Sequence, residues 1–111
     1  MQITWNDFEK IDMRVGTIVE IKPFAKAKKP AWQLTIDFGK ELGIKNSSAQ
    51  ITALYEAEQL VGRQVIAVVN FPPKQIANFI SECLVLGVYN EDNNVVLLQV
   101  ERPVANGCKI G

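Results

Sequence analysis

Two runs of apolar residues in the second half of the chain give the strongest signal for buried strands. Val65–Val69 and Cys83–Leu86 are short and wholly apolar, which is typical of strands inside a core. The loop that joins them also carries side chains that normally avoid water: Phe71, Pro72, Pro73, Ile76, Phe79 and Ile80. Because connecting loops usually lie in water, we expect this one to be covered by its own barrel, a second subunit or a ligand.

Alternation of apolar and polar residues predicts the other strands. It is strict in Trp32–Phe38, where every apolar side chain falls on one face. Val15–Lys22 alternates less regularly, and Gly16 within it predicts a bulge or a sharp bend. Two further strands are predicted on either side of a polar turn: Ser81–Val88 and Val95–Val100.

Two short helices are predicted outside the strands. The first covers Thr4–Lys10, with its first residue as the N-cap and Asp7 as the partner in a capping box. Trp5 and Phe8 share one face of this helix, which is too short to be stable alone and must dock on the barrel or on a partner chain. The second helix is predicted over Thr52–Gly62, from a Thr cap to a terminal Gly.

The segment Ile44–Ile51 has the spacing of a strand but little apolar content. Asn46, Ser48 and Gln50 fall on one face of it, and polar side chains in a barrel must find partners. This face either meets water or forms the polar floor of a ligand site, and the pattern does not choose between the two.

The order of elements is helix, three strands, helix and further strands, within one domain spanning residues 1–111. This order matches the OB-fold, a small Greek-key barrel, so the predicted class is all-β with short helices. The usual OB-fold ligand surface uses strands two and three and the loops after strands one and four. Those loops are the lysine-bearing segment Lys22–Pro30 and the Phe-Pro-Pro loop.

Composition and charge weaken enzyme interpretations. The chain has no His and no Gly-rich phosphate loop, so we predict no catalytic residue, metal or cofactor. An enzyme would need Glu82, Asp12 or Lys74 in an enclosed pocket with a shifted pKa. Basic and acidic residues number twelve each, so nucleic-acid binding would need a local patch. The candidate residues for such a patch are Lys26, Lys28, Lys29, Trp32, Lys45 and Lys74.

The cysteines and the N-terminus bear on the compartment. Cys83 and Cys108 have no framework spacing and are expected to be free, buried thiols of a reducing compartment. No apolar run has the length of a membrane span, and the N-terminus lacks the pattern of a signal peptide. We therefore expect a cytoplasmic protein.

Three features resemble one known family. Ile11–Ile18 is similar to the opening motif of the tRNA-binding OB domain, which occurs in some methionyl- and phenylalanyl-tRNA synthetases and in free-standing dimeric proteins. Ser81–Leu84 resembles the Ser-Glu segment of the same domain. Ile44–Thr52 together with Val68–Pro73 looks more specifically like the CsaA group of bacterial secretion-related chaperones. The resemblance covers nearly the whole chain.

This resemblance implies a homodimer that binds unfolded or presecretory polypeptides without catalysis and cooperates with SecA-dependent export. It also implies a fold built originally around tRNA, so structure-specific tRNA binding is the alternative function. The residues expected to form the polypeptide groove are Asn46, Ser48, Gln50, Phe71, Pro72, Pro73, Ile76 and Phe79.

The sequence also predicts two contacts, one between subunits and one within the barrel. The N-terminal helix and the segment Pro103–Ile110 are expected to make the two-fold contact of the dimer. Arg14 and Glu82 are expected to form a partly buried ion pair between the first and fifth strands, because an unpaired charge beside apolar neighbours would be costly.

Overall fold

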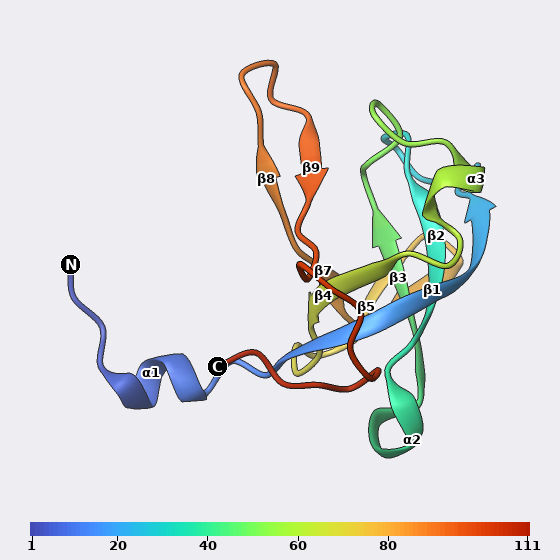
Figure 1. Cartoon of the computed structure of the whole chain (residues 1–111). Coiled ribbons are helices and arrows are strands. Elements are labelled where there is room, and N and C mark those ends of the chain that lie inside the picture. Colours follow the sequence, from blue (N-terminus) through green and yellow to red (C-terminus); the bar gives the residue numbers. More distant parts are fainter.

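Strand β1 (Met13–Pro23) is the longest element and lies in the middle of the main sheet. In the computed structural model, which describes residues 1–111, it pairs with β2 (Trp32–Asp37) along its second half and with β4 (Gln64–Val68) along its first half. β3 (Ile44–Ala49) extends the sheet beyond β2, and β7 (Leu84–Val85) extends it beyond β4. The order β3-β2-β1-β4-β7 is antiparallel throughout and curls into a barrel (Figure 1).

The barrel is nearly closed where β3 meets the segment before β7. The Glu82 N–H donates to the Asn46 carbonyl at 2.8 Å, and the Ser47 hydroxyl donates to the Cys83 carbonyl at 2.8 Å. Ser47 is buried, so its bond satisfies a polar group that would otherwise be costly inside the barrel. The predicted fold class, an all-β OB-fold barrel with short helices, is confirmed.

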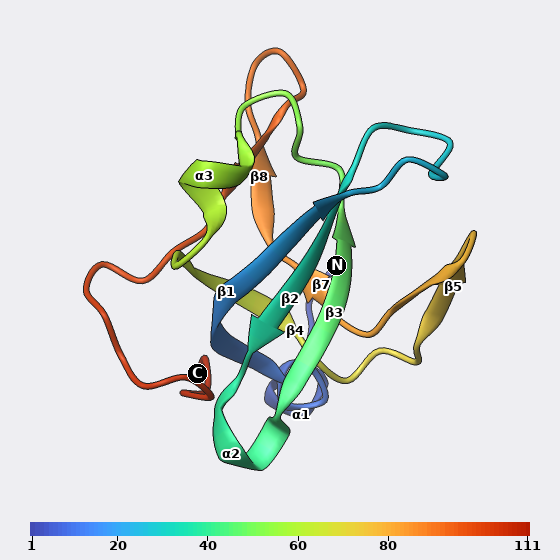
Figure 2. The ribbon, with the colours of Figure 1, turned by 90° about the vertical axis from the view of Figure 1, so that its right-hand side faces the viewer.

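Two hairpins stand apart from the main sheet. The first joins β5 (Lys74–Ile76) to β6 (Phe79–Ser81), and the second joins β8 (Gly87–Tyr89) to β9 (Val95–Leu97). The β8–β9 hairpin rises away from the barrel in Figure 1, and β5 projects on the side of the loop after β1 in Figure 2.

The single strand predicted over Ser81–Val88 was wrong, because this stretch contributes to three different pairings. The chain leaves β6, closes the barrel through Cys83, and then turns out into β8. The Leu86 N–H still donates to the barrel at Ile66, while the Leu86 carbonyl accepts from Leu98 at the base of the β8–β9 hairpin. The last predicted strand is also shorter than expected and ends at Leu97.

The core follows the alternation of β2. Leu34, Ile36 and Phe38 are almost completely buried, as the pattern predicts. Gly16 pairs regularly with Val65, and the irregularity of β1 lies between Ile18 and Glu20, so the bulge predicted at Gly16 was misplaced. The glycine is needed because a Cβ there would lie 2.7 Å from side-chain atoms of Ile36 and Phe38.

Helix α1 (Trp5–Glu9) begins with the predicted capping box. The Asp7 N–H donates to the Thr4 hydroxyl at 3.2 Å, and the Thr4 N–H donates to the Asp7 carboxylate at 2.9 Å. No residue of α1 is buried, and the helix projects from the barrel (Figure 1). The short helix α2 (Gly39–Leu42) joins β2 to β3.

The second predicted helix, Thr52–Gly62, is present only in its second half and only in part. Helix α3 covers Ala57–Leu60, and residues 52–54 form a turn instead. Tyr55 explains the difference: its carbonyl accepts from the Trp32 indole N–H at 3.1 Å, and its hydroxyl accepts from the Leu97 N–H at 3.0 Å. These tertiary bonds hold the chain in a path that a helix over the same residues would not follow.

The C-terminal segment Pro103–Ile110 lies along β1 of its own chain (Figure 1). The Gly107 N–H donates to the Val15 carbonyl at 2.7 Å, and the Val15 N–H donates to the Cys108 carbonyl at 3.0 Å. Its backbone is therefore engaged within the chain at the positions predicted to contact a partner.

None of the helices has the length and apolar character that crossing a membrane requires.

Candidate functional site

The largest hollow of the molecule lies beside the line along which the barrel closes. Its volume is about 650 Å³, and it is bounded by the end of β3, the turn after it, β7 and the inner face of the β8–β9 hairpin. Most of its lining is apolar: Ala49, Ile51, Ala53, Leu54, Leu84, Val85, Leu86, Tyr89 and Val95. The polar lining consists of Lys29, Ser48, Gln50, Lys74, Asn93 and Asn94.

A smaller hollow of about 280 Å³ lies next to the first. Lys74 and Leu84 line both hollows, so the two adjoin at these side chains, and together we call them the seam groove. The smaller part is lined by Phe71, Pro72, Lys74, Ser81, Glu82, Cys83 and Leu84. The seam groove therefore joins the Phe-Pro-Pro loop to the foot of the β8–β9 hairpin.

Several apolar side chains of the groove are open to solvent. Phe71 is 52% exposed, Leu84 is 48% exposed and Leu54 is 42% exposed. The barrel therefore leaves part of the Phe-Pro-Pro loop uncovered. Exposed apolar surface of this kind, rimmed by polar groups, is typical of a site that receives another molecule.

The residues predicted for a polypeptide groove divide into three groups. Ser48 and Gln50 line the larger hollow, and Phe71 and Pro72 line the smaller one. Pro73 is exposed beside the smaller hollow but is not part of its lining.

Asn46, Ile76 and Phe79 are placed elsewhere. The Asn46 carboxamide accepts from the Thr35 hydroxyl at 3.3 Å, and its backbone closes the barrel. Ile76 and Phe79 pair across the β5–β6 hairpin. Both are partly buried, and neither lines a hollow.

The polar strand β3 is bonded through its backbone to the segment that closes the barrel. The Asn46 N–H donates to the Glu82 carboxylate at 2.9 Å, and the Ser48 N–H donates to the Ser81 hydroxyl at 3.1 Å. These groups close the barrel and are satisfied within the chain. Gln50, the residue after β3, is exposed and lines the larger hollow.

The basic residues predicted for a tRNA site are only partly brought together. Lys29 and Lys74 line the larger hollow, and Lys26 and Lys28 lie exposed in the loop that carries Lys29. Lys45 is partly buried on β3. Trp32 is partly buried, packs against the core and donates its indole N–H to the Tyr55 carbonyl.

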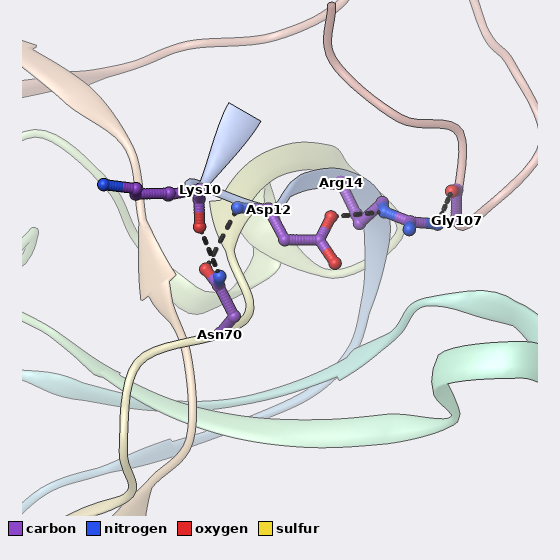
Figure 3. A network of polar contacts seen from close by, with 5 residues as sticks. All are labelled: Lys10, Asp12, Arg14, Asn70 and Gly107. Carbon is purple, nitrogen blue, oxygen red and sulfur yellow. Dashed lines mark hydrogen bonds and ion pairs between the residues drawn. The ribbon is translucent and has the colours of Figure 1, made fainter. Parts of the chain in front are cut away.

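The predicted ion pair between Arg14 and Glu82 was wrong. The Arg14 Nε instead donates to the Asp12 carboxylate at 2.6 Å, and its guanidinium also donates to the Gly107 carbonyl at 3.1 Å (Figure 3). The Asp12 carboxylate raises the pKa of the Arg14 guanidinium above its usual value. The sequence held a signal for this pair, since Asp12 lies two residues before Arg14 and side chains at this spacing in an extended chain point to the same face.

Asn70 extends this network in the other direction. Its side-chain oxygen accepts from the Asp12 N–H at 3.0 Å, and its side-chain nitrogen donates to the Lys10 carbonyl at 2.7 Å (Figure 3). One asparagine thus joins the end of β4 to the end of α1 and the start of β1. Sequence reasoning missed this role, because the partners lie about sixty positions away in the chain.

Both cysteines are free, as predicted, but the expected burial was wrong for Cys108, which is exposed. Cys83 is buried, and burial raises the pKa of its thiol to about 11. Its main neighbours are Asn46, whose carbonyl accepts from the thiol at 3.9 Å, and Ser47. A thiol that stays neutral at ordinary pH is a poor nucleophile, so Cys83 serves packing, while Cys108 is exposed.

Comparison with known proteins assigns the family. The family model described as "Putative tRNA binding domain" matches residues 13–109 of the chain. The chain belongs to this family. It is similar to the CsaA chaperone protein from Picrophilus torridus, at 55% identity over 99% of this chain and 100% of that one, with a TM-score of 0.93. It is also similar to the chaperone CsaA from Bacillus anthracis, at 50% identity over 100% of both chains and a TM-score of 0.93.

These two structures make the chain a CsaA-type member of the tRNA-binding-domain family. A curated relative, the methionine–tRNA ligase of Methanocaldococcus jannaschii, is 35% identical over 109 residues. That match covers 98% of this chain but only 16% of the ligase. No catalytic family is indicated.

Proposed function

We propose that this protein is a molecular chaperone, without catalytic activity, that binds unfolded or presecretory polypeptides in the bacterial cytoplasm during protein export. The observation that carries this proposal is the seam groove, in which Phe71, Leu84 and Leu54 are exposed beside polar groups. The CsaA proteins of similar structure are described as chaperones. Cooperation with SecA is proposed from the CsaA resemblance alone.

The groove has the physical character that an extended, variable polypeptide requires. Apolar side chains of the client, meaning the bound polypeptide, would remove Phe71 and Leu84 from water and gain about 25 cal/mol for each Å² of apolar surface buried. The amide groups of Gln50, Asn93 and Asn94 line the larger hollow and could bond to the client's main chain. Contacts of this kind do not depend on one sequence, which suits a general chaperone.

Homodimerisation is part of the same proposal. Helix α1 buries none of its residues, and Trp5 is 67% exposed. The outer face of the β8–β9 hairpin carries Val88 directly opposite Val96, and both are exposed. A two-stranded hairpin is marginal without cover, so a second copy packed on α1 and this hairpin would stabilise both. The C-terminal segment would contribute side chains, since its backbone is already bonded to β1.

The alternative function is structure-specific tRNA binding. Membership of the tRNA-binding-domain family favours it, as do Lys26, Lys28 and Lys29 in one exposed loop. Two observations weaken it: the chain has no net charge, and the Trp32 ring is engaged with the core. With four lysines on phosphates, the slope of log affinity against log salt would be about −3.

Salt separates the two functions cleanly. The test measures, by fluorescence anisotropy, the binding of an apolar peptide with uncharged flanks and blocked ends, and the binding of tRNA, in rising concentrations of sodium sulfate. We expect peptide affinity to hold or increase, because sulfate strengthens apolar association, and any tRNA affinity to fall steeply. A protein that binds tRNA in this salt-sensitive way and fails to bind the peptide would replace the proposed function with the alternative.

A further inference from the structure

We propose that Asn70 is the positioning residue of the seam groove, because it fixes Phe71 at the mouth of the smaller hollow. This inference rests on the proposed function, since it concerns how the same groove holds a polypeptide. Asn70 itself lines neither hollow. Its effect on binding would therefore pass through Phe71, which follows it directly and is the aromatic side chain of the smaller hollow.

The chain is held firmly on the N-terminal side of Phe71. The Val69 N–H donates to the Asp12 carbonyl at 2.8 Å, and the Asp12 N–H donates back to the Asn70 side-chain oxygen at 3.0 Å. The Asn70 side-chain nitrogen adds a bond of 2.7 Å to the Lys10 carbonyl. Figure 3 shows the carboxamide placed between these two backbone groups. Together these hydrogen bonds fix the position of the chain just after the end of β4.

The residues that follow have no such bonds. The main chain at Phe71, Pro72 and Pro73 makes no hydrogen bond to any other part of the protein. The chain is next held at Lys74, which pairs with Ser81 in the β5–β6 hairpin. The segment that presents Phe71 is therefore a bridge between two fixed points, and Asn70 is the nearer of them.

The prolines transmit the position of Asn70 to the aromatic ring. A residue before proline is restricted to extended backbone conformations, and proline fixes its own φ near −65°. Phe71 precedes Pro72, and Pro72 precedes Pro73, so the bridge has little freedom to absorb a change at its start. A displacement at Asn70 would therefore move the Phe71 ring, because the residues after it cannot compensate by changing their backbone angles.

Polypeptide affinity in a set of variants tests this role. Without the Asn70 carboxamide, Phe71 would spend a smaller fraction of time at the mouth of the hollow, and apparent affinity falls in proportion to that fraction. For Asn70→Ala we expect the affinity for an uncharged apolar peptide to fall by about five-fold. Asn78→Ala is the matched control, because Asn78 is an exposed asparagine in the tight turn of the adjacent β5–β6 hairpin and should leave the affinity unchanged.

A double-mutant cycle distinguishes positioning from a general loss of stability. If Asn70 acts through Phe71, then Asn70→Ala should weaken binding in the wild-type background and have no further effect in a Phe71→Ala background. Equal weakening in both backgrounds, or wild-type affinity in Asn70→Ala, would overturn the proposal while leaving the chaperone function standing. Failure of the wild-type protein itself to bind the peptide would overturn the proposed function, and this inference with it.

Discussion

The phenyl ring of Phe79 meets the ring of Phe24 edge to face, with the ring centroids 5.4 Å apart. Phe24 is buried in the loop after β1, and Phe79 is half-buried on β6. The contact therefore ties the lysine-bearing loop to the β5–β6 hairpin, which project on the same side of the barrel (Figure 2). Two phenylalanines of one apolar loop thus have different surroundings, since Phe71 remains half exposed at the groove.

This difference predicts that two similar substitutions lower the free energy of unfolding by unequal amounts. Phe79→Ala removes the aromatic contact and leaves a gap, so the free energy of unfolding should fall by about 1–3 kcal/mol. Phe71→Ala is the matched control and should cost under about 1 kcal/mol, because much of the ring is already in water. Urea unfolding followed by circular dichroism measures both losses. Equal losses of stability would contradict the packed position of Phe79 and the exposed position of Phe71.

The Tyr55 hydroxyl predicts a local effect at the β8–β9 hairpin. Tyr55→Phe leaves the Leu97 N–H without its acceptor, which should cost about 1 kcal/mol and make this amide exchange with solvent markedly faster. Tyr89→Phe is the control, since Tyr89 is 73% exposed. Hydrogen exchange observed by NMR reports on the Leu97 amide directly. Unchanged protection of Leu97 in Tyr55→Phe would show that the hydroxyl does not anchor the hairpin.

Cys83 predicts a loss of stability in alkali. Burial raises the pKa of its thiol from an ordinary value of 9.0 to about 11, so the folded state holds this proton more tightly than the unfolded state does. The associated stability is complete below pH 9 and is lost as the pH rises toward 11, by about 1.4 kcal/mol per pH unit at most.

The comparison with Cys83→Ala isolates this titration from those of other groups. At pH 8 the variant should be less stable than the wild type because of the cavity it creates. The difference in free energy of unfolding between the wild type and the variant should narrow steadily between pH 9 and pH 10.5, because only the wild type has a buried thiol that can lose its proton. Stability curves that stay parallel over this range would show that the thiol does not titrate as described.

Gly16 predicts a cost of overpacking. In Gly16→Ala the new methyl group would lie 2.7 Å from atoms of Ile36 and Phe38, and relief of the overlap should cost about 1–3 kcal/mol. Gly111→Ala is the control, because its surroundings are open. Thermal unfolding of the two variants checks the difference. A melting temperature for Gly16→Ala equal to that of the wild type would contradict the packing described for β1 and β2.

The barrel could be predicted because its strongest signals are local. Alternation fixed which residues of β2 face the core, and the capping box at Thr4 marked the start of α1. The errors came from distant partners. Tyr55 bonds to residues on other elements and shortens a helix that its own segment favours. Arg14 binds the carboxylate of Asp12, just before its own strand, instead of the predicted Glu82.

The candidate groove was predicted less completely than the fold. The Phe-Pro-Pro loop and the end of β3 could be chosen from their composition. The β8–β9 hairpin was predicted as a pair of strands around a polar turn, but its place as a wall of the larger hollow, through Tyr89 and Val95, was missed. Its position depends on the burial of Leu97 and on the Tyr55 hydroxyl, and neither has a signal within the hairpin's own sequence.

The most direct test of the account is to locate the bound polypeptide by NMR. An uncharged apolar peptide with blocked ends is titrated into the ¹⁵N-labelled protein, and the shifted backbone amides are mapped on the chain. The account predicts saturable shifts at Gln50, Phe71, Leu84 and Tyr89, on both parts of the seam groove. Shifts confined to α1 or to the loop that carries Lys26 would contradict it.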